Sequence, residues 1–171
     1  MFHTNRPVIE VEKPIWAKAF SLISLILLIA ASIYLALSWN DLSDVIPIHF
    51  NAAGEADGYG GKWSAIMLPV IGFVMWGGLT ALERVPHTYN YLGKITEENA
   101  EKQYLNGVLM MNVIKNLCVL LFAYITYELT LIGTGGNANL TAGVMPVFLT
   151  LLFVSMGWFI YRSIKLSSFR R

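Results

Sequence analysis

The chain has 171 residues, of which 56% are hydrophobic and only 13% are charged. Soluble domains are about half apolar and about a quarter charged, so this composition excludes an ordinary soluble domain and favours a membrane protein. The formal net charge is +1, so the chain as a whole gives no reason to expect nucleic-acid binding. The lone cysteine, Cys118, lies in an apolar segment and cannot form a disulfide within the chain.

Four apolar segments are long enough to cross a bilayer, which takes about 20 helical residues. They are 15–37, 63–82, 108–131 and 144–161, and we expect one domain, 1–171, with an all-α fold: a bundle of four transmembrane helices. The first segment ends near Ala36-Leu37-Ser38, which resembles a signal-peptide cleavage site. Its apolar stretch is too long for a signal peptide, so we expect an uncleaved helix.

The outer loop, 40–62, is expected to be structured. Apolar residues alternate with other types in Ile46-Pro47-Ile48-His49-Phe50-Asn51, and this period of two predicts a short extended piece with His49 and Asn51 on one face. Pro47, Gly54 and Gly58 are expected to shape the loop, because proline fixes one backbone angle and glycine permits turns that other residues resist.

Polar side chains in the outer loop form the strongest candidate for chemistry: His49, Asn51, Glu55 and Asp57. A histidine ring, carboxylates and an amide oxygen can bind a divalent metal, with His49 and Asp57 as candidate ligands. The spacing fits neither the zinc-helix motif nor the EF-hand, so a structural cluster with hydrogen bonds inside the loop is favoured. No cofactor is predicted, and a divalent metal is the alternative.

The inner segment, 83–107, is predicted to lengthen the third helix. Thr96 is suited to cap a helix, and Glu97 and Glu98 follow it in the first turn. A helix starting near residue 96 would stand about three turns clear of the hydrocarbon before it enters the third span. This extension is either a solvated face or a docking site for a cytoplasmic regulator.

Polar residues also fall inside the third span: Asn112, Lys115, Asn116 and Glu128. Charged groups inside a membrane are costly and are therefore candidates for function. Lys115 and Glu128 are about 19 Å apart along a helix, too far to pair, so anchoring of each at its own interface is favoured over ion transport. Asn112 and Asn116 share the face of Lys115 and are expected to form hydrogen bonds between helices.

The basic residues predict the orientation of the chain. Ten of the twelve Lys and Arg residues lie on one side of the predicted spans, Lys62 lies on the other, and Lys115 is inside a span. Because Lys and Arg in short loops stay in the cytoplasm, both termini are predicted to be cytoplasmic. The expected location is the plasma membrane, with the lipid bilayer as the first partner.

Two stretches resemble a known family. The outer stretch consists of Asp44-Val45-Ile46-Pro47-Ile48-His49-Phe50-Asn51, Gly54-Glu55-Ala56-Asp57-Gly58-Tyr59-Gly60 and Lys62-Trp63. It resembles the signature loop of the bacterial membrane family called domain of unknown function sixteen forty-eight. The inner stretch, Pro86-His87-Thr88-Tyr89-Asn90-Tyr91, is similar to a second segment in small members. The same domain forms the N-terminal part of the sporulation-delaying toxin immunity protein.

The sequence contains no nucleophile and base set, phosphate-binding glycine loop or metalloprotease motif, so no catalytic residue and no enzymatic activity are predicted. We expect a non-enzymatic protein of toxin-immunity or envelope-signalling type, whose outer loop meets an extracellular peptide or toxin and which signals to a cytoplasmic regulator. The alternative is a small transporter or ion-coupled carrier that works as a homo-oligomer. The third hypothesis is a membrane hydrolase with a metal at His49.

Overall fold

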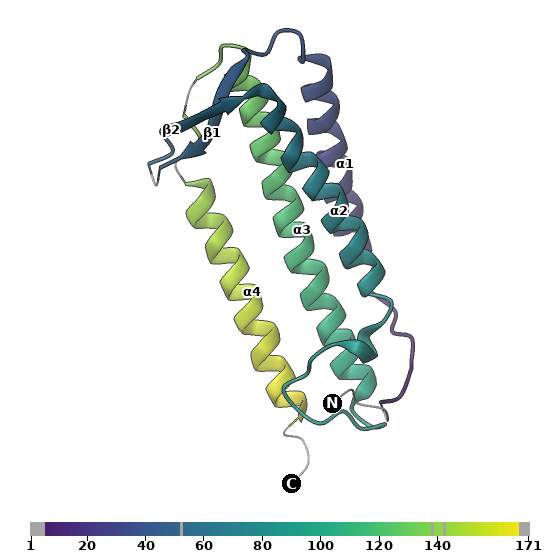
Figure 1. The fold of residues 1–171 in the computed structure, drawn as a ribbon. Coiled ribbons are helices and arrows are strands. Elements are labelled where there is room, and N and C mark those ends of the chain that lie inside the picture. Colours follow the sequence, from purple (N-terminus) through teal and green to yellow (C-terminus); the bar gives the residue numbers. More distant parts are fainter. Residues whose placement is uncertain (1–5, 52, 138, 142, 168–171) are drawn as a thin grey trace.

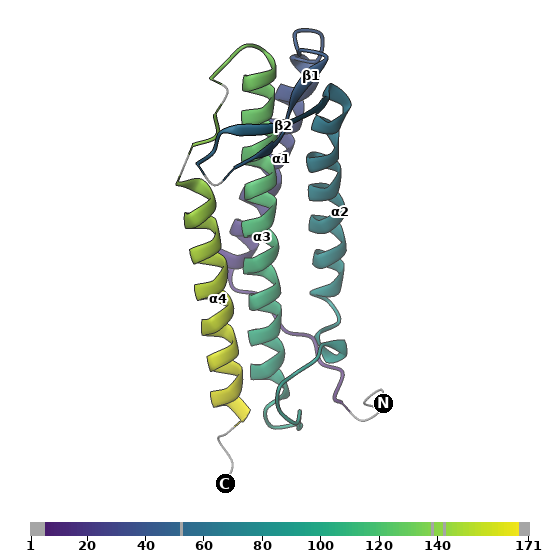
Figure 2. The same ribbon diagram turned by 60° about the vertical axis from the view of Figure 1, so that its left-hand side comes forward.

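The computed structural model describes residues 6–51, 53–137, 139–141 and 143–167. Within these residues, four helices are long and apolar enough to cross a membrane. They are α1 (Ile15–Leu37), α2 (Met67–Leu82, preceded by the 3-10 turn η1, Lys62–Ile66), α3 (Ala100–Gly133) and α4 (Val144–Ser167). The helices lie side by side and alternate in direction, so the start of α1 and the end of α4 are at the same end of the bundle (Figures 1 and 2). The prediction of a mostly helical chain with these candidate spans is confirmed.

Four helix boundaries differ from the prediction. The helix α2 begins at Met67, after the 3-10 turn that occupies the predicted start, and α3 ends at Gly133, two residues beyond the expected end. The helix α3 begins at Ala100, later than the expected start near residue 96. Residues 96–99 instead form a turn, in which the Thr96 carbonyl accepts from the Ala100 amide at 2.9 Å and the Asn99 Oδ1 accepts from the Thr96 amide at 2.9 Å. The helix α4 continues past the expected end at Tyr161 to Ser167.

The ends of the helices follow from proline and glycine. Pro14 directly precedes α1, and Pro146 lies in the first turn of α4, where its missing N–H would have no helical partner. At the end of α3, Gly135 adopts a φ of 95°, a conformation that favours glycine. The amide of Gly136 then reaches back to the Leu131 carbonyl at 2.9 Å and closes the helix end.

The all-α expectation is incomplete, because the described part of the outer loop contains a small antiparallel sheet. Its strands are β1 (Val45–Phe50) and β2 (Ala56–Gly61), joined by a turn in which Gly54 has a φ of 84°. We call this pair of strands the hairpin. The strand β1 is the extended piece that the alternation of residues predicted. The glycine-rich β2 packs closely against it, since a Cβ on Gly58 would lie only 2.9 Å from the His49 Cβ.

The hairpin is fixed to the helices by a buried apolar cluster. Ile46 of β1 is fully buried with Leu35, Leu42 and Ala65. The backbone adds a link, since the Ser43 amide donates to the Gly133 carbonyl at the end of α3 at 2.9 Å. The base of the hairpin is therefore part of the core, while its tip projects over the start of α4 (Figure 1).

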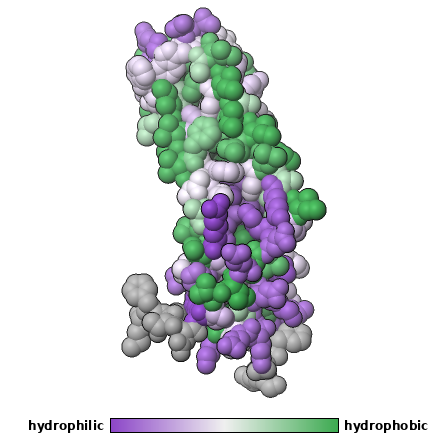
Figure 3. Space-filling view, turned by 90° about the vertical axis from the view of Figure 1, so that its right-hand side faces the viewer, coloured by the Kyte–Doolittle hydropathy of each residue, from purple (hydrophilic) through white to green (hydrophobic). Residues whose placement is uncertain are grey.

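The helix α3 is the centre of the bundle and contacts α1, α2, α4 and β1. Large apolar side chains of the other helices face outward, as expected for surfaces in contact with lipid. Figure 3 shows hydrophobic side chains over much of the surface on the hairpin side, with hydrophilic side chains at both ends and most extensively at the end away from the hairpin. The buried residues of α4 are Phe159 and Ser163, so this helix is attached to the bundle by a narrow contact.

Candidate functional site

A buried ion pair joins α2 to α3 at the end of the bundle away from the hairpin. The Nζ of Lys115 lies 2.7 Å from Oε1 of Glu83, the residue that directly follows α2. The exposed fractions of the two side chains are 0% and 2%, respectively. The ammonium group also donates to Thr80 at 2.8 Å and lies 5.5 Å from the centre of the Trp76 ring. These contacts replace the water that a buried charge loses.

A second lysine binds the same carboxylate. Lys13, which lies just before α1, contacts Oε2 of Glu83, and its side chain is 23% exposed. One buried carboxylate therefore faces two ammonium groups, which leaves the site with an excess of positive charge. The site links the segment before α1, the end of α2 and the middle of α3.

Hydrogen bonds extend from this ion pair along the contact between α1 and α3. The Nδ2 of Asn112 donates to Glu83 at 3.2 Å and to the Ser21 hydroxyl at 2.8 Å. Asn116 donates to the same hydroxyl at 3.1 Å and accepts from Ser24 at 2.7 Å. These four polar residues and the charged residues Lys13, Glu83 and Lys115 form what we call the buried polar network.

The structure brings Lys115, Asn112 and Asn116 together, but it contradicts the expectation that Lys115 reaches the membrane interface. Its side chain is completely buried, because Glu83 approaches from α2. Glu128 is partly exposed near the other end of α3 and takes no part in the network. Sequence reasoning missed Glu83 as the partner. The available signal was that Glu83 directly follows the second predicted span, at the end of the bundle to which Lys115 also lies closer.

In the hairpin, the predicted polar residues separate into two pairs. The Nδ1 of His49 lies 2.5 Å from Oδ1 of Asp57, and the two side chains are 71% and 45% exposed. Asn51 donates to the Glu55 carboxylate at 2.9 Å, and its Oδ1 accepts the amides of Ala53 and Glu55 at 2.9 and 3.0 Å. Asn51 thus organises the turn, whereas His49 and Asp57 form an exposed pair across the strands.

A divalent metal site at His49 and Asp57, the alternative prediction for the hairpin, requires several ligand side chains close together. Across the described residues, no three His, Cys, Asp or Glu side chains come close enough to hold a metal ion. His49 and Asp57 supply two such groups, and the Nδ1 of His49 is directed at the Asp57 carboxylate. A hydrolytic site of three protein ligands and a base is therefore not assembled by these residues.

A cavity of about 350 Å³ lies beneath the hairpin tip, between the turn, α3 and the start of α4. Phe50, Asn51 and Gly54 form its hairpin wall, and the other walls are mainly apolar. The remaining lining residues are Leu121, Tyr124, Ile125, Leu140, Thr141, Val144, Met145, Pro146 and Leu149. We call this space the hairpin cavity. Its size and mostly apolar walls are typical of sites that bind small molecules or single side chains.

The candidate spans and the charges buried between them define the chain as a multi-pass membrane protein. The model of the family described as Domain of unknown function (DUF1648) matches residues 26–73, from the middle of α1 through the hairpin into α2. The predicted family resemblance is confirmed for this segment.

Most of the chain is also similar to a curated archaeal protein. An uncharacterized protein of Archaeoglobus fulgidus is 26% identical over 163 residues, which cover 81% of this chain and 87% of that protein. No solved structure matches the chain. The relative comes from an archaeon, so the bacterial membrane stays a prediction for this chain.

Proposed function

We propose that this chain is a non-enzymatic receptor of the membrane, of toxin-immunity or envelope-signalling type, which takes its ligand at the hairpin cavity. The observation that carries the proposal is the combination of a fixed base and a polar tip in one hairpin. Ile46 holds the base in the core, and at the tip Asn51, which donates to Glu55, lines an apolar cavity. A rigid element beside a preformed cavity favours ligand binding, because the protein loses little conformational entropy when the ligand binds.

The charge around the hairpin favours a cationic ligand with an apolar portion, such as an amphipathic peptide. Exposed carboxylates surround the hairpin at Asp41, Asp44, Glu55 and Asp57. Lys62 supplies a cation there and lies 3.1 Å from Asp44. Complementary charge speeds encounter and aligns the ligand, while the cavity takes up its apolar side chain.

The proposed orientation has the hairpin outside the cell and both termini in the cytoplasm of a bacterial plasma membrane. The support is the concentration of Lys and Arg residues at the end away from the hairpin. In this orientation the loop between α2 and α3 and the first turns of α3 face a cytoplasmic regulator. Assembly of the chain into a homo-oligomer is compatible with the apolar outer faces of α1, α2 and α4.

The test is protection of cells against membrane-active peptides. Cells that express the chain are expected to survive cationic amphipathic peptides better than cells with an empty vector. Met145→Trp fills the hairpin cavity and should remove this difference. Val154→Trp is the matched control, because Val154 lies on the same helix, is 66% exposed and does not line the cavity. Unchanged sensitivity to every peptide of the panel, with the protein present in the membrane, would reject the proposal.

The second candidate is a small ion-coupled carrier, which the buried polar network favours. Ionisable groups inside a membrane commonly mark ion or proton pathways. However, Lys115 and Glu83 already have hydrogen-bond partners, and neither lines the hairpin cavity. Proton or ion flux into proteoliposomes, abolished by Lys115→Met, would favour the carrier over the receptor.

A further inference from the structure

An extended segment precedes α1 at the end of the bundle away from the hairpin (Figure 1). We call this segment, residues 6–14, the strap; it forms neither helix nor strand. Its side chains alternate, because Ile9, Val11 and Lys13 are half-buried and the residues between them are exposed. Ile9 and Val11 pack against a buried cluster that includes Tyr104 of α3. One face of the strap is therefore turned toward the bundle and the other away from it.

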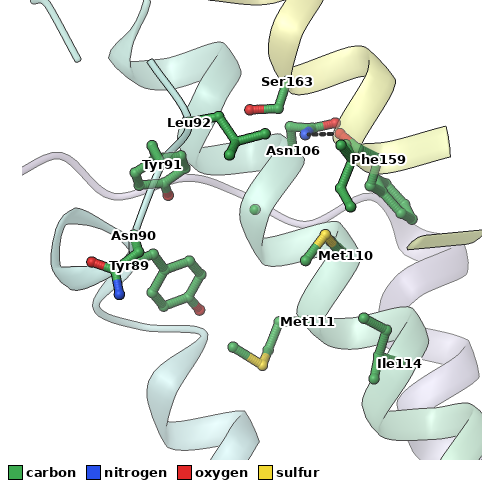
Figure 4. A pocket seen from close by; sticks show the side chains of 12 residues that line it. Tyr89, Asn90, Tyr91, Leu92, Asn106, Met110, Met111, Ile114, Phe159 and Ser163 are labelled. Carbon is green, nitrogen blue, oxygen red and sulfur yellow. Dashed lines mark hydrogen bonds between the residues drawn. The ribbon is translucent and has the colours of Figure 1, made fainter. Parts of the chain in front are cut away.

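The start of the strap is held by the loop between α2 and α3. Arg6 donates to the carbonyls of His87 and Tyr89 at 3.2 and 2.5 Å, and its guanidinium carbon lies 5.5 Å from the centre of the Tyr91 ring. The two tyrosines also form one wall of a cavity of about 390 Å³ between this loop, α3 and α4 (Figure 4). None of these contacts of Arg6 involves Glu83, so the start of the strap has an attachment of its own.

A second bond of this attachment comes from α3. The Tyr104 hydroxyl donates to the Pro7 carbonyl at 2.9 Å. The start of the strap is thus tied to two elements, the loop and α3.

The other end of the strap is held by the buried carboxylate. Lys13 binds Oε2 of Glu83, and the exposed fractions of the two side chains are 23% and 2%. The other members of the buried polar network are buried as well, so Lys13 is the member that reaches the surface of the bundle. The ammonium group of Lys13 therefore stands between Glu83 and the water at this end of the bundle.

The strap can leave without breaking a helix. Among the described residues, no backbone–backbone hydrogen bond joins residues 6–13 to the rest of the chain. The helix α1 is complete without them, because its first bonds run from the amides of Ala17 and Lys18 to the Pro14 carbonyl. An ion pair of Glu12 with Lys18 also links the strap to α1, but it is exposed and therefore weak. Segments held in this way open at a lower free energy than packed helices.

We propose that the strap is a gate, which opens as one unit about Pro14, withdraws Lys13 and admits water to the Glu83 carboxylate. In the closed state, Lys13 seals the pair of Glu83 and Lys115. In the open state, this pair still joins α2 to α3 at 2.7 Å, while Oε2 of Glu83 loses its ammonium partner and is hydrated. The gate lies at the opposite end of the bundle from the hairpin cavity, and its opening does not depend on the receptor function proposed above.

The test measures how fast Glu83 reacts with a water-soluble carbodiimide and glycinamide in nanodiscs, where both ends of the bundle are accessible. The carbodiimide activates the carboxyl group, and the amine of glycinamide then forms an amide and releases a urea. Mass spectrometry of peptides counts this adduct at Glu83 and at the exposed Glu97, which is the internal reference. Glu83 of the native protein should react at least about tenfold more slowly than Glu97, because it reacts only while the strap is open.

Three variants distinguish a gate from local cover by one side chain. Lys13→Gln removes the seal and should raise the ratio of Glu83 to Glu97 labelling by about three- to tenfold. Arg6→Gln and Tyr104→Phe weaken the attachment at the start of the strap alone. Each should raise the same ratio, because the strap opens as one unit.

Lys102→Gln is the matched control, because Lys102 is exposed on α3 at the same end of the bundle and the change of charge is the same. It should leave the ratio at the native value. A rise with Lys13→Gln that neither Arg6→Gln nor Tyr104→Phe reproduces would overturn the proposal, since Lys13 alone would then cover the carboxylate. Equal labelling of Glu83 and Glu97 in the native protein would overturn it as well, because a closed strap has to protect Glu83.

Discussion

Lys115 of α3 donates a hydrogen bond to Glu83 at the end of α2, over 2.7 Å between Nζ and Oε1, and both side chains are buried. Removing one member of such a pair leaves a charge without a partner in a poorly solvated place. The two positions are not equivalent, however, because Glu83 also binds Lys13. The loss of the carboxylate leaves two ammonium groups, whereas the loss of Lys115 leaves the carboxylate with one.

We therefore expect Glu83→Leu to lower the free energy of unfolding by about 3–5 kcal/mol and Lys115→Met to lower it by roughly 1–3 kcal/mol. The double variant should be more stable than Glu83→Leu alone, because it removes one of the stranded ammonium groups. Denaturant titration in detergent micelles measures all three, and Glu97→Leu, at an exposed position, is the control. Equal costs for Glu83→Leu and Glu97→Leu would contradict a structural role for the pair.

In the hairpin, Asn51 should matter more for stability than His49. Asn51 makes hydrogen bonds to Glu55 and Ala53 that hold the turn, so Asn51→Ala should destabilise the hairpin by about 1–2 kcal/mol. The pair of His49 and Asp57 is exposed, and His49→Ala should cost less than about 1 kcal/mol. Hydrogen exchange of the β1 amides measures both effects. A larger loss of protection in His49→Ala than in Asn51→Ala would contradict the conclusion that Asn51 organises the turn.

The spans could be predicted, but the side-chain pairing could not. The length of an apolar run reports a membrane-spanning helix directly, and the first predicted segment, 15–37, has the same bounds as α1. The pairing of Glu83 with Lys115 depends on how α2 is rotated against α3, which no local pattern records. Alternation also predicted His49 beside Asn51, but the pairing of β1 with β2 is irregular at His49, and each residue found a different partner.

A close contact at Gly133 should make the attachment of the hairpin sensitive to one methyl group. A Cβ at Gly133 would lie 2.4 Å from Leu42 Cδ2 and 3.2 Å from Ile46 Cγ2, in the cluster that holds the hairpin base. Gly133→Ala should therefore cost about 1–3 kcal/mol through overpacking. Gly78→Ala is the matched control, because a Cβ there meets nothing within 4 Å and alanine favours a helix. In detergent, the midpoint temperature of thermal unfolding should be lower for Gly133→Ala than for the native protein, and equal or higher for Gly78→Ala.

Labelling of single cysteines in intact cells tests most directly whether the hairpin faces outward from a membrane-embedded bundle. In a Cys118→Ala background, cysteine replaces Ala53 at the exposed hairpin turn or Glu97 in the exposed loop before α3. A thiol reagent that cannot cross membranes should label Ala53→Cys in intact cells and Glu97→Cys only after lysis, because the basic end of the bundle stays in the cytoplasm. Labelling of Glu97→Cys before lysis, with Ala53→Cys protected, would contradict the proposed orientation and with it the receptor role of the hairpin.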